Sequence, residues 1–342
     1  MIRDIYKRVL VLGRGMVGQA FERQGFTAWG RGAIDFPYPD DGSTPSLYDL
    51  ARMLLNYDII VNAIGKADTR WCESNYSRAM WSNADVPAML ARVCRDMNKL
   101  LIHVSTGCVY PSGCVFHHEG DRYQLTNSYL LSKMCGEMAI RTLGDHAVIL
   151  RPRLIFSDSP SKFNLLNKLT QFDKFTIEPE TITSTSSIVD IVEHIAHQDD
   201  LDQFRGNTYN VGCASPISPY AIAEILEIKK GPLGIYCPDR QSDDYVATQT
   251  LMDLDASAEL VDLRDTVQEL KRCWKACDLG SKSTATTFVT AMCSKAEWPK
   301  WPTSLSDGKH DIFQHKAGHC DNREAFREIV EKVDEYTNSH VA

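Results

Sequence analysis

The sequence predicts an α/β fold with a doubly wound parallel sheet, and two observations predict it. Short apolar runs that are typical of strands alternate with amphipathic helical segments between residues 8 and 156. The first run, RVLVL, leads directly into a glycine-rich turn, GRGMVG, which opens a helix. Strands that alternate with helices form a parallel sheet with helices on both faces. We therefore expect a Rossmann-type domain followed by a smaller C-terminal portion.

The expected elements follow one another along the chain. Strands are expected in RVLVL, GFTAW, YDIIVNAIG (57–65), KLLIHVS and HAVILRPRLIF. In NADVPAMLARVCRDM the apolar residues recur at helical spacing, which predicts an amphipathic helix. NSYLLSKMCGEMAIRTLG (127–144) predicts another helix, which Gly144 is placed to end. Beyond it, SSIVDIVEHIAHQ predicts a helix and GNTYNVG a strand.

Composition and charge exclude several classes of protein. The 342 residues carry a formal net charge of -8 and no long basic run, which argues against a nucleic-acid partner. No apolar run approaches the roughly 18 residues that span a bilayer, and the charged N-terminus is unlike a secretory signal. The eleven cysteines follow no disulfide-framework spacing, so we expect a cytoplasmic protein.

Metal binding is not expected. The cysteines and histidine that could be drawn as zinc ligands match no structural zinc spacing. They are Cys273, Cys277, Cys293, His319 and Cys320.

The glycines of GRGMVG predict a dinucleotide site. Gly13, Gly15 and Gly18 give a tight turn, close approach of the backbone to a pyrophosphate, and close packing of helix on strand. The pattern follows an N-terminal strand and opens a helix, as the site requires. Met16 and Val17 lie in the same turn and are expected at the cofactor.

The residues near the end of the second strand favour NADP(H), with NAD(H) as the alternative. An acidic residue there would bind the ribose 2′-hydroxyl of NAD, but the sequence offers WGR. Arg14 and Arg31 suit a 2′-phosphate, although two solvated surface arginines would give the same pattern. Further cofactor contacts are expected from Asp35, Ala63 and Gly65.

A Tyr-x-x-x-Lys motif supplies candidate catalytic residues. Tyr129 and Lys133 lie on one face of a helix, and an ammonium near a phenol lowers the pKa of the phenol. Tyrosine then becomes a proton donor or acceptor near neutral pH. Thr106, at a strand end about 23 residues upstream, is expected to hydrogen-bond a substrate carbonyl beside Tyr129. As a lone motif, the pair would more often be solvated surface.

These motifs resemble those of the extended short-chain dehydrogenase/reductase superfamily, and in particular its sugar-nucleotide reductases of L-rhamnose synthesis. The chain is most similar to the nucleotide-rhamnose synthase/epimerase-reductase of plants and viruses, and it also resembles the dTDP- or UDP-4-dehydrorhamnose reductases. The resemblance covers roughly residues 7–275. Its segments are VNAIG, RWCESNYSRAMWSNADVPAMLARVCRD, VSTGCVY, NSYLLSK, LRPRLIFSD, FNLLNKLTQFDKFTIEP and GNTYNVG. GRGMVG departs from the family's G-x-x-G-x-x-G by one residue.

The resemblance implies roles for individual residues. Thr106, Tyr129 and Lys133 correspond to the family's reduction residues, and Tyr129 and Lys133 also to its cofactor contacts. In the bifunctional members a cysteine and a lysine act in epimerisation, and these match Cys108 and Lys168. The substrate contacts implied are Thr106, Cys108, Asn83 and Asn164.

The same resemblance implies an activity. It is NADPH-dependent 3,5-epimerisation and 4-reduction of a nucleoside-diphosphate 4-keto-6-deoxyhexose, which gives a nucleotide-L-rhamnose. Three alternatives stay open: reduction alone, with Cys108 a core residue; a C4-epimerase or dehydratase of the same fold; and a non-catalytic regulatory subunit. The sequence does not choose between uridine and thymidine. A homodimer is a candidate assembly.

Three regions follow from these expectations. Residues 1–156 are expected to form the NADP-binding Rossmann domain, to which segments near 188–212 return. Residues 157–280 are expected to form the substrate-binding portion. Residues 281–342 form a C-terminal extension whose role the sequence does not indicate.

Overall fold

The computed structural model describes residues 5–277 apart from several gaps. The gaps are 35, 37, 40–45, 111–114, 172–174, 176–179, 213–216, 227, 229–243 and 247–262. The expected C-terminal extension 281–342 and the expected cofactor residue Asp35 therefore lie outside the described residues.

A six-stranded parallel sheet forms the centre, in the order β2–β1–β3–β4–β6–β9. The strands are β1 (Val9–Leu12), β2 (Thr27–Trp29), β3 (Ile59–Asn62), β4 (Leu100–Val104), β6 (Ala147–Pro152) and β9 (Thr208–Val211). The chain leaves β1 toward β2 and then crosses to β3 on the other side of β1. This reversal is the point at which open α/β sheets bind ligands, beyond the carboxyl ends of the strands.

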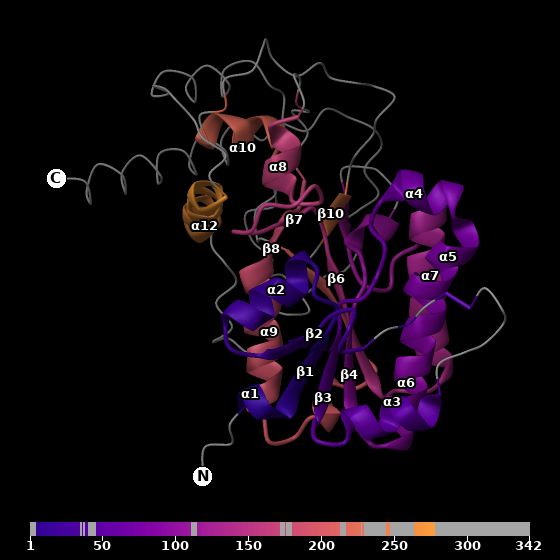
Figure 1. Cartoon of the computed structure of the whole chain (residues 1–342). Coiled ribbons are helices and arrows are strands. Elements are labelled where there is room, and N and C mark those ends of the chain that lie inside the picture. The colour runs from indigo at the N-terminus through magenta and orange to yellow at the C-terminus, as the bar shows by residue number, and fades with distance from the viewer. Residues whose placement is uncertain are drawn as a thin grey trace, which may run out of the picture.

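Helices cover both faces of the sheet (Figure 1). One face carries α1 (Ile5–Arg8), α2 (Met16–Arg23) and α9 (Thr185–His197). The other face carries α3 (Leu47–Leu54), α4 (Thr69–Ser74), α5 (Tyr76–Met80), a π-helical turn (Trp81–Asp85), α6 (Val86–Asp96) and α7 (Ser128–Thr142). The central strands β1, β3, β4 and β6 are mostly apolar, as expected for strands that are buried on both faces.

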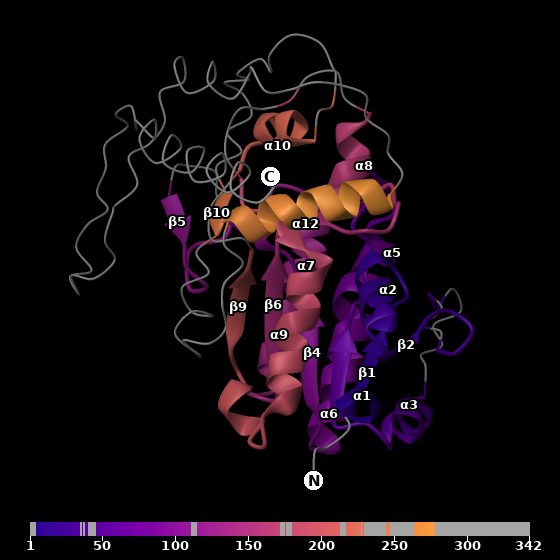
Figure 2. The same cartoon turned by 90° about the vertical axis from the view of Figure 1, so that its left-hand side faces the viewer.

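A separate apolar cluster lies above the carboxyl ends of the strands, where α12 crosses over α9 (Figure 2). Its elements are β7 (Ile155–Phe156), α8 (Leu165–Leu169), β8 (Thr183–Ser184), α10 (Pro219–Ile225) and α12 (Leu263–Ala276). The remaining short elements are two 3₁₀ turns (Gly107–Val109 and Asp202–Phe204), β5 (Val115–His117) and its parallel partner β10 (Asp244–Val246).

The predicted fold class is confirmed, because the sheet is parallel and helices cover both of its faces. After β7 the chain returns to the first layer: α9 packs on α2, and β9 pairs with β6. Gly144 follows the end of α7 with φ of +103°, a conformation that glycine adopts readily. No helix in the described part of the chain is both long and apolar enough to cross a bilayer.

Candidate functional site

The glycine-rich turn after β1 is closed so tightly that side chains would not fit at two of its glycines. Gly13 has φ of +105°, and a Cβ there would lie 2.7 Å from the Ala63 carbonyl carbon at the end of β3. A Cβ at Gly18 would lie 1.8 Å from the Gly13 oxygen, so this glycine lets α2 pack on the turn. A Cβ at Gly15 would meet nothing within 4 Å. The turn therefore has open space at Gly15, the N-cap of α2.

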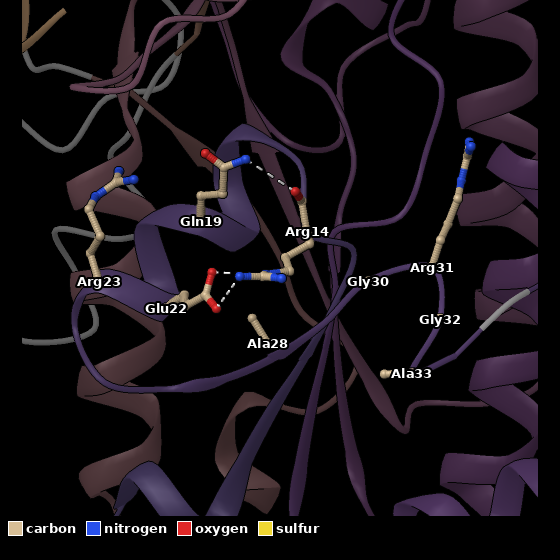
Figure 3. A pocket seen from close by; sticks show the side chains of 9 residues that line it. All are labelled: Arg14, Gln19, Glu22, Arg23, Ala28, Gly30, Arg31, Gly32 and Ala33. Atoms are coloured by element: carbon tan, nitrogen blue, oxygen red, sulfur yellow. Dashed lines mark hydrogen bonds and ion pairs between the residues drawn. The ribbon is translucent and has the colours of Figure 1, made fainter.

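A cavity of about 770 Å³ lies beside this turn (Figure 3). Its lining residues come from the turn, from α2 and from the end of β2: Arg14, Gln19, Glu22, Arg23, Ala28, Gly30, Arg31, Gly32 and Ala33. Both arginines that the sequence assigned to a 2′-phosphate, Arg14 and Arg31, therefore line one cavity.

Arg14 is engaged in an ion pair that the sequence analysis missed. Its Nε donates to Glu22 Oε2 at 2.9 Å, and its Nη2 lies 2.7 Å from Glu22 Oε1. Figure 3 shows Arg31 apart from this pair, with its guanidinium directed away from Glu22. The sequence did contain a signal for this contact. Gln19 and Glu22 share a helix face that begins at the turn carrying Arg14, so both side chains can reach it.

Thr106, Cys108 and Tyr129 meet just beyond the carboxyl end of β4. Thr106 caps a short 3₁₀ turn, and its Oγ1 accepts a hydrogen bond from the Cys108 amide at 3.2 Å. The hydroxyls of Thr106 and Tyr129 are hydrogen-bonded, and the Cys108 and Cys72 thiols lie close enough to influence the Tyr129 phenol electrostatically. Asn127 caps α7 by accepting from the Leu130 amide, which fixes the first turn that carries Tyr129.

The expectation that Lys133 lowers the pKa of Tyr129 is wrong. Burial raises the pKa of Tyr129, the Cys108 thiol adds to the rise, and the Thr106 hydrogen bond only partly opposes it. The Lys133 ammonium instead donates to the Val104 carbonyl at 2.8 Å. Burial lowers the pKa of Lys133 to about 8, against the opposing effect of Glu137. Tyr129 is therefore protonated at neutral pH.

A buried ionic network supports the loop that follows β4. The Arg151 guanidinium donates to both carboxylate oxygens of Glu137, with a shortest contact of 2.6 Å, and neither side chain is exposed to solvent. The Ser105 hydroxyl donates to the same carboxylate, and Arg151 also donates to the Tyr110 hydroxyl at 2.6 Å. Ser105 directly precedes Thr106, so the network holds the strand end. No pattern in the sequence predicted this network, although Glu137 lies one helical turn after Lys133.

The two asparagines expected at the substrate are fully buried and bonded within the chain. Asn83, in the π-helical turn, accepts from the Lys66 amide at 2.7 Å and donates to the Ser132 hydroxyl at 2.9 Å. Asn164 caps α8 and donates to the carbonyls of residues 157 and 159. These contacts favour a supporting role over direct substrate contact for both.

The remaining expected residues take different positions. A Cβ at Gly65 would lie 3.7 Å from the Lys133 ammonium, so the turn after β3 passes over Lys133. Met16 and Val17 begin α2, and Ala63 follows β3 beside Gly13. Lys168 is exposed on α8, in the upper cluster, and no hydrogen bond or ion pair links it to Cys108 among the described residues. Within the same residues, no group of three or more His, Cys, Asp or Glu side chains could hold a metal ion.

Comparisons with curated proteins find partial relatives. A trifunctional UDP-glucose 4,6-dehydratase/UDP-4-keto-6-deoxy-D-glucose 3,5-epimerase/UDP-4-keto-L-rhamnose-reductase of Arabidopsis thaliana is 27% identical over 240 residues, which are 66% of this chain and 33% of the relative. The dTDP-4-dehydrorhamnose reductase of Mycobacterium tuberculosis is 30% identical over 117 residues, 32% of this chain and 38% of the relative. The matched part of the chain thus spans about a third of the length of these curated relatives.

A solved structure and a family model complete the comparison. The dTDP-4-dehydrorhamnose reductase of Bacillus anthracis in complex with NADP superposes with a TM-score of 0.61 at 14% identity, over 79% of this chain and 98% of that one. At this identity the likeness shows the fold. The model of the RmlD substrate binding domain matches residues 7–230, well over half of the sequence. The chain therefore belongs to the RmlD substrate binding domain family.

Proposed function

We propose that this protein is an NADPH-dependent reductase of a nucleoside-diphosphate 4-keto-6-deoxyhexose, and that it also epimerises the sugar at C3 and C5. One observation carries the proposal: two hydroxyls and a thiol meet at the carboxyl end of β4, above a buried lysine. They belong to Thr106, Tyr129, Cys108 and Lys133. This is the edge of the sheet at which the fold binds ligands.

The residues of the first strand end fit a dinucleotide. Gly15 leaves open space at the N-terminus of α2, where helix amides and dipole favour a pyrophosphate. Arg14 and Arg31 line a cavity next to that turn and suit a 2′-phosphate, which favours NADP(H) over NAD(H). In this proposal Lys133, whose ammonium lies close to Gly65, holds the hydroxyls of the nicotinamide ribose. Bound NADPH supplies the hydride that the sugar receives at C4.

The protein contributes a proton and an anion site to the reduction. Tyr129, whose pKa burial raises, stays protonated at neutral pH and can donate its proton to the C4 oxygen as the ketone becomes an alcohol. Thr106, already hydrogen-bonded to Tyr129, can hydrogen-bond the same oxygen. The two hydroxyls therefore converge on one substrate atom.

Epimerisation needs a base, which Cys108 supplies in this proposal. The C4 ketone acidifies the hydrogens at C3 and C5, so a thiolate can remove one and leave an enolate. Thr106 and Tyr129 would stabilise the enolate oxygen as they stabilise the alkoxide. Reprotonation from the opposite face inverts the centre, and Lys168 is the proposed acid. The exposed side chain of Lys168 then has to reach the sugar from α8.

The family and its relatives support the proposal. The names of both relatives include reduction of a 4-keto or 4-dehydro rhamnose nucleotide, and the Arabidopsis relative also carries a 3,5-epimerase name. The Bacillus anthracis structure holds NADP. Membership of the family supports reduction most directly, while epimerisation rests on Cys108 and on the Arabidopsis relative.

Solvent exchange separates the two activities. The protein is incubated with UDP- or dTDP-4-keto-6-deoxyglucose in deuterated water, with and without NADPH, and the sugar is analysed by mass spectrometry and NMR. We expect deuterium at C3 and C5 without NADPH, and a reduced rhamnose nucleotide with it. Cys108→Ala is expected to lower the exchange rate at least about a hundredfold, the scale on which a positioned base acts.

Cys135→Ala is the matched control, because Cys135 is also a partly buried cysteine and lies in the middle of α7. It should leave exchange unchanged. Unchanged exchange in Cys108→Ala would contradict the role of Cys108. NADPH consumption only after a separate epimerase is added would reduce the function to reduction alone. No turnover of either sugar would contradict the proposed function.

A further inference from the structure

The Arg14–Glu22 ion pair lies where the proposed function requires a site for the 2′-phosphate. Building on that function, we propose that Glu22 sets how strongly the protein discriminates NADP(H) from NAD(H), because its carboxylate competes with the 2′-phosphate for Arg14. The two cofactors differ only by this phosphate, so one competing carboxylate acts on one of them.

Arg14 lies beside the end of β2, where a 2′-phosphate is expected. A Cβ at Gly30 would lie 2.8 Å from Arg14 Cβ and 3.4 Å from its Cδ, so the stem of Arg14 packs against the residue that follows β2. In this fold the 2′-position of the adenosine ribose lies at the end of β2. The Arg14 guanidinium is therefore within the region that a 2′-phosphate would occupy.

Glu22 occupies the side of the Arg14 guanidinium that a phosphate would use. Glu22 binds the guanidinium at two points, through Nε at 2.9 Å and Nη2 at 2.7 Å. A phosphate prefers the same two-point contact with a guanidinium. Gln19 restrains the turn further, because its Nε2 donates to the Arg14 carbonyl at 3.4 Å. A 2′-phosphate must therefore displace Glu22 from Arg14 or share the guanidinium with it.

The charged residues that line the cavity make Glu22 the group that opposes a phosphate. Glu22 is the one acidic residue among the described residues that line the cavity. Arg23 is held elsewhere, since it donates to Ser159 at 2.6 Å and pairs with Asp158. Arg31 is exposed and makes no ion pair with the described residues. Glu22 therefore opposes the phosphate both by repulsion and by holding Arg14, whereas the 2′-hydroxyl of NAD carries no charge to oppose.

Calorimetric titration with NADP⁺ and with NAD⁺ tests this without requiring turnover. We expect Glu22→Gln to tighten NADP⁺ binding roughly five- to tenfold, as removal of a half-exposed ion pair and of a like charge implies. NAD⁺ binding should change less than about twofold. Asp96→Asn is the control, because it removes an exposed carboxylate paired with Arg95 outside the cavity and should alter neither affinity.

A double-mutant cycle isolates competition for Arg14. Arg14→Met should weaken NADP⁺ binding, and Glu22→Gln should give a smaller gain in that background than in the wild type. An equal gain in both backgrounds would overturn the competition. The side chain of Glu22 is 39% exposed, so we expect these variants to fold, which circular dichroism and melting temperature will verify.

The outcomes separate this inference from the proposed function. If the wild-type protein binds neither dinucleotide, the proposed function fails, and the role of Glu22 fails with it. If both dinucleotides bind and the ratio of their affinities stays within about twofold in Glu22→Gln, only the role of Glu22 is refuted.

Discussion

Glu137→Gln is expected to destabilise the folded protein by about 3–5 kcal/mol, because it leaves the buried charge of Arg151 without its counter-ion. Neither side chain is exposed, and Arg151 reaches both carboxylate oxygens of Glu137 through contacts of 2.6, 3.0 and 3.2 Å. An arginine does not lose its proton to relieve the cost. The amide of the variant also presents an NH₂ group where the carboxylate accepted from Ser105 or Arg151.

The magnitude is large against the total stability of a domain, which is about 5–15 kcal/mol. For a protein of this size, a loss of this order lowers the melting temperature by roughly 10 °C. Urea unfolding followed by circular dichroism measures the free energy directly, and a thermal scan gives the melting temperature.

Two further variants test whether the loss of stability comes from the unpaired buried charge of Arg151. Asp202→Asn breaks an ion pair with Arg205 in which the aspartate is 80% exposed, so it should cost less than about 1 kcal/mol. The double variant Glu137→Leu/Arg151→Met removes both charges and should be more stable than Glu137→Gln. If Glu137→Gln unfolds within about 1 kcal/mol of the wild type, or if the double variant is less stable than the single one, the account of this buried pair is refuted.

Two more predictions concern Lys133 and the glycine turn. Burial lowers the pKa of Lys133 from 10.5 to about 8. Between these pH values the unfolded chain binds a proton that the folded chain has lost, so raising the pH across them should stabilise the wild type by about 3 kcal/mol relative to Lys133→Met. Urea unfolding at pH 7.5, 9 and 10.5 measures this difference. If the unfolding free energies of the two proteins change with pH in parallel, the argument from burial is contradicted. Gly18→Ala should lower the melting temperature strongly, because its Cβ would lie 1.8 Å from the Gly13 oxygen. A Cβ at Gly15 meets open space, so Gly15→Ala should keep the fold and weaken only NADP⁺ binding. Equal decreases in melting temperature for the two variants would contradict this prediction.

Much of the fold could be predicted because its signals are local. The strands β1, β3 and β4 are mostly apolar runs, and α6 and α9 repeat their apolar residues at helical spacing. The short helices α4 and α5 and the π-helical turn were not predicted, because segments this short show too few repeats for periodicity to detect. The π-helical turn also depends on a distant contact, since Asn83 bonds Ser132 of α7.

Part of the candidate site could be predicted from the sequence, and part of it could not. Thr106, Tyr129 and Lys133 could be found because a strand end and a four-residue helical spacing are visible in the chain. The burial of the two asparagines could not be predicted, because the sequence does not show which polar side chains become fully buried. Asn83 lies 17 residues from the Lys66 amide that it accepts from, and Asn164 bonds the loop that leads into α8.

The sequence by itself determined the class of fold, the turn of Gly13, Gly15 and Gly18, and the hydroxyls at the end of β4, because backbone conformation and residue spacing are local properties. The tertiary structure decided the charge states and partners. It raised the pKa of Tyr129 by burial, directed Lys133 to the Val104 carbonyl, and paired Arg14 with Glu22. Desolvation and ion pairing depend on which groups the folded chain brings together, so spacing along the chain did not reveal them.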